Sequence, residues 1–440
     1  MSDRRNTRFS ALLLAALLAG APSAALAQSL LSATPPRVTN ESLFGDNPAS
    51  AKPGDDELQV NALLIYDMAI LSDEDVSSST SDQRTAIRPE ARVEVLYAPD
   101  EDLQVFGAIE AGFDHDRRGT VTTNLARLEL RELFVLFDDF LAKNFQLQIG
   151  RQDFEDKREW LYDSRIDGVR MAYDHRQWRV ELAWVREELV RSDLLHARTR
   201  KRPDNFVFHA EYEVTRNWDL SAYAIRQADR TGRNLKPITV GLQSEGKTGA
   251  VGHWLELAMQ RGKSGSRKLR SWAIDAGLTW SLPFRGTPTL IAGYARGSGG
   301  GDARIDGKFR QTGLQDNEDR ISGLGNVRYY GELLDPDLSN IQIATAGIGF
   351  RPGPTSSVEV IAHRYWQSTR DDGDIAGALL TAEMDGDSRF IGTEIDVIGA
   401  IRLTPTLGLE AKLGWFKAGT GLSGANRDAF LAKFRLVKRL

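Results

Sequence analysis

Basic side chains recur at every second position in parts of this chain, in rows that also hold glutamate or aspartate. Arg127, Glu129 and Arg131 form one such row, and Lys433 and Arg435 form another near the C-terminus. A spacing of two places side chains on one face of a β-strand. Guanidinium groups bind carboxylates with two parallel hydrogen bonds, and rings of Arg or Lys select anions in pores. The rows therefore indicate an anion-recognition surface, if strands bring them together.

Enzymatic chemistry is a competing interpretation, and it requires a nucleophile beside a base. The histidines stand in no Gly-x-Ser-x-Gly turn and no His-Glu-x-x-His helix. They are His115, His175, His196, His209, His253 and His363. The chain has no cysteine, and hence no disulfide and no thiolate metal site. We therefore expect no enzyme, no cofactor and no metal site. Ester hydrolysis by the purified protein, lost on mutating one serine or histidine, would argue for the enzyme.

The N-terminus carries the three parts of a secretory signal. Three arginines precede an apolar run from Phe9 to Ala19, and Ala25-Leu26-Ala27 supplies the small residues of a cleavage site before Gln28. The apolar run is shorter than the roughly 20 residues of a membrane-spanning helix. We expect a cleaved signal peptide at 1–27, a short periplasmic segment at 28–57 and one domain at 58–440. The net charge of −5 gives no indication of nucleic-acid binding.

Apolar and polar residues alternate along most of the remaining chain. In "LGLEAKLGW" the apolar set from Leu407 to Trp415 occupies odd positions, and Glu410 and Lys412 lie between them. The polar face is often ionised, so it must be wet. Aromatic residues such as Trp178 and Trp280 lie near segment ends, where amphipathic rings favour a bilayer interface. Both observations place the apolar face in lipid.

Eighteen segments alternate in this way, each about as long as the roughly 9–11 residues that a tilted strand needs to cross a bilayer. They are 58–71, 85–98, 102–114, 123–137, 143–151, 166–174, 177–186, 204–215, 217–228, 236–244, 252–261, 270–281, 287–296, 340–351, 355–367, 389–401, 405–417 and 428–440. Connections after even-numbered segments are short, and those after odd-numbered segments are usually long, as at 187–203 and 297–339. The sequence therefore predicts an all-β fold, a transmembrane antiparallel β-barrel of about 18 strands with short periplasmic turns and long extracellular loops.

If the apolar faces meet lipid, the other faces line a lumen. The basic residues expected there are Arg88, Arg92, Arg127, Arg131, Arg170, Lys412, Lys433 and Arg435. The acidic residues expected there are Glu90, Glu94, Glu110, Glu129, Glu394 and Asp396. These charges either pair across strands and hydrate the wall, or the cations form a ring that attracts anions. The excess of arginine over lysine favours the ring.

Two motifs break the alternation. One pairs "FRQTGLQDN" (309–317) with "RYYGELLDPDLSN" (328–340), and the other is "GRQDF" followed by "REWLYDSRIDGVR" (150–170). Together they resemble the signature of the bacterial alginate export family of outer-membrane porins. The resemblance implies an eighteen-stranded outer-membrane barrel that passively exports an anionic uronic-acid polymer through an arginine-rich pore. The terminal Leu440 departs from the aromatic residue common at the end of such barrels.

The resemblance also assigns residues. It implies that Arg151 and Arg170 face the lumen, although strict alternation would point Arg151 outward with Ile149. The residues that match the long-loop motif are Arg310, Gln311, Tyr330, Glu332, Asp335 and Asn340. Their polarity and the turn-forming Asp335-Pro336 favour an ordered loop that folds into the pore or caps it, whereas "GSGGG" at 297–301 also suits a flexible surface loop.

Two further alternatives stay open. An anion-selective uptake porin for small acidic nutrients shares the fold and the basic lining. The acidic stretches 316–319 and 371–388, expected outside the barrel, could bind calcium, but neither has EF-hand spacing. We expect a monomer whose partners are an anionic polysaccharide or small anions, outer-membrane lipid and lipopolysaccharide, and candidate periplasmic export proteins, with no nucleic acid.

Overall fold

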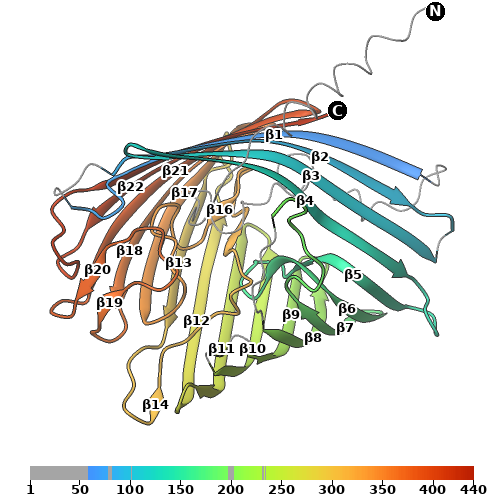
Figure 1. Ribbon diagram of the computed structural model, residues 1–440, viewed down its shortest axis with the longest axis horizontal. Coiled ribbons are helices and arrows are strands. Elements are labelled where there is room, and N and C mark those ends of the chain that lie inside the picture. Colours follow the sequence, from blue (N-terminus) through green and yellow to red (C-terminus); the bar gives the residue numbers. More distant parts are fainter. Residues whose placement is uncertain (1–57, 78–81, 101, 197–202, 230–231, 233) are drawn as a thin grey trace, which may run out of the picture.

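The computed structural model describes residues 58–77, 82–100, 102–196, 203–229, 232 and 234–440. The expected signal peptide and the segment 28–57 lie outside the described residues. The described chain forms the predicted closed antiparallel barrel of 18 strands (Figure 1). The first strand, β1 (Leu58–Ser72), pairs with the last, β23 (Ala429–Arg439), and closes the wall. Among the described residues no helix is long and apolar enough to cross a membrane.

Every predicted segment coincides with a wall strand, and the strands follow one another around the barrel in chain order (Figure 1). The remaining wall strands are β2 (Arg84–Tyr97), β3 (Leu103–Arg118), β4 (Val121–Phe137), β5 (Phe145–Glu155), β6 (Asp163–His175), β7 (Trp178–Arg186), β8 (Asp204–Thr215), β9 (Trp218–Ala228), β10 (Leu235–Thr248), β11 (Val251–Ser264), β12 (Arg267–Ser281), β13 (Thr289–Gly297), β17 (Ile341–Gly353), β18 (Ser356–Gln367), β21 (Phe390–Thr404) and β22 (Leu407–Ala418).

The alternation places the two faces as predicted. Val60, Leu242 and Leu413 on the outer face are 56–61% exposed, whereas Glu110 and Glu394 on the inner face are at most 2% exposed. Burying these carboxylates demands polar partners inside the barrel. The outer face instead presents an apolar surface suited to lipid.

The connections alternate around the two rims. Turns such as 176–177, 216–217 and 249–250 define a short-turn end, and the loops 187–203, 298–340 and 368–389 define a long-loop end. The loop after β18 carries a small hairpin of β19 (Asp372–Asp374) and β20 (Glu383–Asp385) at the long-loop end. Two connections at the long-loop end are shorter than the pattern predicts: β3 is joined to β4, and β11 to β12, by a turn of two residues.

The wall is irregular at β4 and β5. A register shift opposite Ala108 and Ile109 makes Arg131 the extra residue of a β-bulge. Strand β5 pairs with β4 only from Leu133 to Phe137, and residues 192–194 of the β7–β8 loop bond instead to β4 near Glu129. The two strands therefore separate toward the long-loop end.

The long connection between β13 and β17, residues 298–340, folds inside the barrel, and we call it the inner loop. It holds the two-residue strands β14 (Ile305–Asp306), β15 (Glu318–Asp319) and β16 (Val327–Arg328), and Figure 1 shows β16 within the ring of wall strands. Its middle reaches the short-turn end, where Arg351 donates to the carbonyls of Ser322 and Gly323. The inner loop therefore runs the height of the lumen and returns.

An apolar core forms between the inner loop and the wall. It includes Trp160 of the β5–β6 loop, Phe309 and Leu333 of the inner loop, and Tyr365 and Phe416 of the wall. These side chains are at most 1% exposed. Burial of this apolar area is what holds an otherwise irregular segment in one conformation.

Candidate functional site

Five of the predicted lumenal arginines, on β2, β4 and β23, form a network with carboxylates on β1–β4, and we call it the ion-pair lattice. Arg92 donates to Glu110 at 2.8 Å, and Arg127 contacts Asp114 at 2.9 Å as well as Glu90. The basic members are Arg88, Arg92, Arg127, Arg131 and Arg435, and the acidic members are Asp67, Glu90, Glu94, Glu110, Asp114 and Glu129. Cross-strand register brings them together, because β23, β1, β2, β3 and β4 are consecutive neighbours in the wall.

The lattice is balanced and not cationic. Five guanidinium groups meet six carboxylates, and each arginine lies within 3.5 Å of at least one of them. Arg131 shares the inner face with Arg127 and Glu129, as their spacing predicts, and reaches Glu110 at 3.5 Å and Glu129 at 3.6 Å. The sequence identified these basic residues and favoured a cationic ring. The pairing in the structure instead matches the alternative hypothesis, in which lumenal charges neutralise one another across strands.

Arg170 and Arg151 lie in other surroundings. Arg170 pairs with Glu181 at 2.5 Å and lies over the ring of Phe154. Arg151 forms a two-pronged pair with Asp167 at 2.9 Å and also donates to the carbonyls of Leu130 and Val190. The side chain of Arg151 thus fills the separation between β4 and β5 and joins the β7–β8 loop to the wall. We therefore leave Arg151 out of the proposed pore lining.

Lys412 and Lys433 bind the inner loop. The Nζ of Lys412 lies 2.6 Å from Glu318 and 2.9 Å from Glu332, and Lys433 lies 3.4 Å from Glu332. Burial opposes ionisation of Glu332, but Lys412 and Lys433 outweigh it and lower the pKa of Glu332 to about 2. These two lysines were predicted as pore-lining cations, and the structure places them as anchors of the inner loop.

Wall carboxylates also anchor the inner loop by accepting its backbone N–H groups. Glu394 accepts from Leu333 at 2.7 Å and from Leu334 at 3.0 Å, and Glu359 accepts from Ser322 at 3.1 Å. Such charge-assisted bonds are stronger than neutral ones. The sequence placed Glu394 on the inner face but gave no sign of its partners, since these lie 60 residues away in the chain.

A second cluster of charges lies within the inner loop itself. Arg328 contacts Asp316 at 3.1 Å, Glu318 at 3.8 Å and Asp335. Burial raises the pKa of Asp316 to about 8 and that of Asp335 to about 6, although Arg328 opposes both shifts. The stretch 316–319, expected outside the barrel, is therefore inside it, and that expectation was wrong for a physical reason: Arg328 supplies the counter-charge that burial requires.

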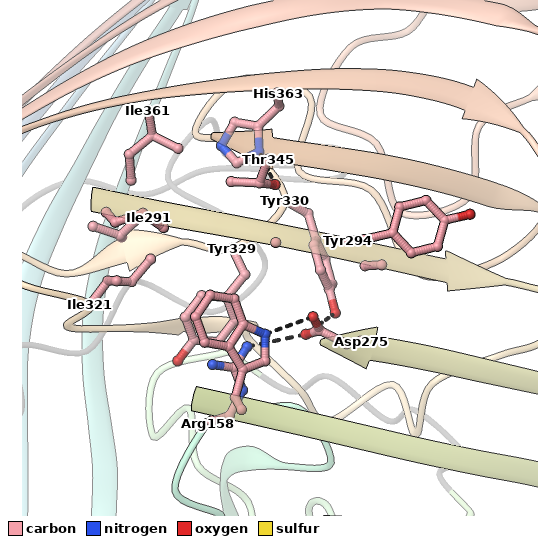
Figure 2. A pocket seen from close by; sticks show the side chains of 14 residues that line it. Arg158, Asp275, Ile291, Tyr294, Ile321, Tyr329, Tyr330, Thr345, Ile361 and His363 are labelled. Carbon is pink, nitrogen blue, oxygen red and sulfur yellow. Dashed lines mark hydrogen bonds and ion pairs between the residues drawn. The ribbon is translucent and has the colours of Figure 1, made fainter. Parts of the chain in front are cut away.

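The inner loop is locked to the β5–β6 loop, residues 156–162, by aromatic and charged contacts (Figure 2). The guanidinium of Arg158 lies 4.0 Å from the ring centre of Tyr329 and 4.8 Å from that of Trp254, within the range of cation–π attraction. Arg158 pairs with Asp275 of β12 at 3.1 Å, and the hydroxyl of Tyr330 donates to the same carboxylate at 3.1 Å. Two loops and one wall strand therefore meet at Asp275.

All six residues of the predicted loop motif lie in this interior. Gln311 donates to the carbonyl of Trp160 and accepts from the N–H of Leu338, each at 3.1 Å, and Arg310 pairs with Asp306 at 2.8 Å. Asn340 bonds to Thr369 of the next loop. Tyr330, Glu332 and Asp335 make the contacts described above. The expectation of an ordered segment folded into the barrel agrees with these contacts.

Two polar cavities flank the inner loop. The larger, about 440 Å³, lies at the short-turn end and is lined by Lys157, Lys247 and Arg320 together with Asp219, Glu245 and Asp319. The smaller, about 170 Å³, lies at the long-loop end beside Lys308, Arg310, Asp371 and Asp374. Both mix the two signs of charge.

Carboxylates also gather where a cation could bind. Oxygen atoms of Glu159, Asp163 and Asp316 lie within 4.8 Å of one another, as do those of Asp153, Glu155 and Asp163. Oxygen-rich groups of this kind suit hard cations. In the first group Arg328 already faces Asp316, so a positive charge is present there without an ion.

Comparisons with known proteins agree with the fold and the motifs. A family profile described as "Alginate export" matches residues 72–429. The alginate production protein AlgE of Pseudomonas aeruginosa is 32% identical over 136 residues, and that of Azotobacter vinelandii is 30% identical over 135 residues. These matches span 30% and 29% of this chain and only 26% and 28% of the relatives.

Solved barrels share the architecture at much lower identity. The P. aeruginosa protein OccK7 (OpdD) aligns with 88% of this chain and 99% of its own, with a TM-score of 0.56 and 13% identity. OccK11 (OpdR) of the same organism aligns with 87% and 96%, with a TM-score of 0.55 and 14% identity. At these identities the likeness concerns the fold alone.

Proposed function

This chain belongs to the alginate export family, and we propose that it forms an outer-membrane channel through which an anionic, alginate-like polyuronate leaves the cell passively. The short-turn end would face the periplasm and the long-loop end the exterior, as in outer-membrane barrels generally. In this proposal the barrel acts as a monomer and catalyses no reaction. It receives the polymer from periplasmic export proteins.

The observation that supports this function best is the ion-pair lattice. A uronate carboxylate has the same charge and shape as the wall carboxylates, so it can replace them on Arg92, Arg127 or Arg131 one pair at a time. Because the lattice is already neutralised, such exchange holds the polymer weakly. A conducting site must bind well enough to admit a substrate and weakly enough to release it.

The inner loop would set the bore of this channel. It is anchored to β18, β21 and β22 on one side and to β11 and β12 on the other. A polymer chain would pass beside it or displace it from the wall. Arg170 would add to the lining, whereas Lys412 and Lys433 would become available to substrate only when Glu332 moves away.

Uptake of small acidic nutrients is the second candidate, and the two cavities favour it. Volumes of about 440 and 170 Å³ with charged linings match small ions better than a long polymer. Small-molecule sites usually span about 300–1,000 Å³. The lattice arginines and the cavity residues would then guide small anions into the cell and not a polymer out of it.

Single-channel conductance in a planar bilayer separates these candidates. We expect anion selectivity under a salt gradient and block by added oligouronate, with the block weakened at least tenfold in the Arg127→Ala, Arg131→Ala double variant. Anion selectivity without oligouronate block would favour the small-anion porin. Cation selectivity, or absence of conductance even after deletion of residues 309–339, would contradict an arginine-lined pore.

A further inference from the structure

Six basic side chains lie next to one another on the outer face of β9–β12, and we call them the outer basic patch. The register places Arg226 opposite Ile238, Ile238 opposite Arg261, and Arg261 opposite Arg270. Two positions closer to the long-loop end, Lys236, Lys263 and Lys268 stand opposite one another in a second row. All six side chains are exposed.

The patch borders the apolar band of the wall directly. On the same face, the next pair toward the short-turn end is Met259 opposite Trp272, which are 65% and 41% exposed. An outward tryptophan marks the level of a membrane interface. The arginine row therefore lies at the height at which lipid head groups meet the acyl chains.

The patch lacks the neutralisation found inside the barrel. Within the described part of the chain, no ion pair and no side-chain hydrogen bond involves any of the six, whereas the lattice arginines are all paired. Like charges that face each other across strands destabilise a sheet. Two neighbouring rows of three cations each therefore call for an external anion.

An apolar groove of about 400 Å³ opens beside the patch. Its lining includes Leu182, Trp184, Phe206, Phe208, Ile238 and Arg226. Arg226 belongs to both features, and Ile238, which lines the groove, lies between Arg226 and Arg261 in the register. The surface thus combines a basic platform for a head group with an adjoining apolar groove.

We propose that the outer basic patch and this groove bind a phosphorylated, acylated lipid of the outer leaflet. Guanidinium forks match phosphate oxygens in two-pronged geometry, and basic surfaces at this level of a membrane bind anionic head groups. Arg226, Arg261 and Arg270 hold the phosphates, the lysine row attracts a second anionic group, and one acyl chain occupies the groove. The site requires only a membrane-embedded barrel, so it stands independently of polyuronate export.

Native mass spectrometry of the full-length barrel in detergent tests the site, with diphosphorylated lipid A as the probe and its dephosphorylated form as the comparison. We expect the Arg226→Gln, Arg261→Gln, Arg270→Gln variant to bind diphosphorylated lipid A at least tenfold more weakly. The matched control, Lys143→Gln, Arg216→Gln, Arg285→Gln, removes three exposed cations from turns at the opposite rim and should bind as the parent does.

Folding of each variant is verified by heat-modifiable migration in electrophoresis. If the triple variant fails to fold, Arg226→Gln alone should still weaken binding about threefold, because it removes the residue shared by patch and groove. Equal binding by patch and control variants, equal binding of the dephosphorylated lipid, or displacement of the lipid by oligouronate would each overturn the proposal.

Discussion

Lys412 of β22 and Glu332 of the inner loop lie 2.9 Å apart, nitrogen to oxygen, and both side chains are buried. Glu318 shares the same ammonium group at 2.6 Å. The wall thus supplies one cation to two loop carboxylates. Because neither carboxylate can be solvated in place, this contact stabilises the docked inner loop alongside its apolar core.

Lys412→Met should release the inner loop. Removing one partner of a buried ion pair costs about 3–5 kcal/mol, since it leaves an uncompensated charge. We expect faster proteolysis within residues 309–340 and a larger, noisier single-channel conductance. Lys417→Met is the control, because Lys417 lies on the same strand but is exposed. Unchanged cleavage in Lys412→Met would show that the loop is held by its apolar core alone.

Tyr330→Phe should loosen the junction of the two loops at Asp275. The hydroxyl of Tyr330 accepts from Trp160 at 2.8 Å and donates to Asp275 at 3.1 Å, so its loss removes both bonds inside the barrel. An unsatisfied buried polar group costs about 1–3 kcal/mol. Hydrogen exchange of residues 156–162 and 326–334 should therefore accelerate.

Tyr329→Phe is the matched comparison for Tyr330→Phe. It keeps the ring that packs on Arg158 and removes only a hydroxyl. Exchange rates close to those of the parent are expected for this variant. Similar acceleration in both variants would argue against a specific role for the Tyr330 hydroxyl.

Docking of the inner loop should weaken as the pH rises from about 5 to 9. The folded-state pKa values of Asp316 and Asp335, about 8 and about 6, lie above the ordinary value of 3.8 because of burial. The folded protein then binds more protons than the unfolded chain, so its stability falls as the pH rises through these values. Glu332, with a pKa of about 2, contributes no change in this window.

Conductance fluctuations measured between pH 5 and pH 9 check this pH dependence. Fluctuations in the parent should increase with pH, and Asp316→Asn, which mimics the protonated carboxyl group, should flatten the increase. A parent whose fluctuations grow toward acidic pH would contradict the assignment.

Glu110→Gln should remove the excess negative charge of the lattice and release two of its arginines. Glu110 neutralises both Arg92 at 2.8 Å and Arg131 at 3.5 Å. Loss of its charge leaves these guanidinium groups available, so anion selectivity should rise and oligouronate should block at least threefold more tightly. Glu383→Gln, an exposed change in β20 outside the wall, should alter neither property. A weaker block in Glu110→Gln would mean that the arginines do not meet the substrate.

Much of the fold could be predicted because alternation is local. Whether a residue faces lipid or lumen depends on its position in the strand and on the polarity of its neighbours, so all 18 segments and the lumenal placement of Arg127 and Arg435 could be predicted from the sequence. Alternation and the family motif disagreed at Arg151, which precedes the detachment of β5 from β4. Arg131 joins the lumenal charges as its spacing predicted, although it stands in a bulge.

The partners of the charges depended on the tertiary structure. The basic rows in the sequence indicated an anion-attracting pore, but register around the closed wall sets a carboxylate beside each lattice arginine. Lys412 and Glu318 are 94 residues apart, and Arg158 and Asp275 are 117 residues apart. The sequence by itself therefore determined the barrel and the faces of its strands, because these follow from backbone periodicity. Only the closed structure decided which charges are neutralised and where the inner loop lies, because both depend on burial against residues far away in the chain.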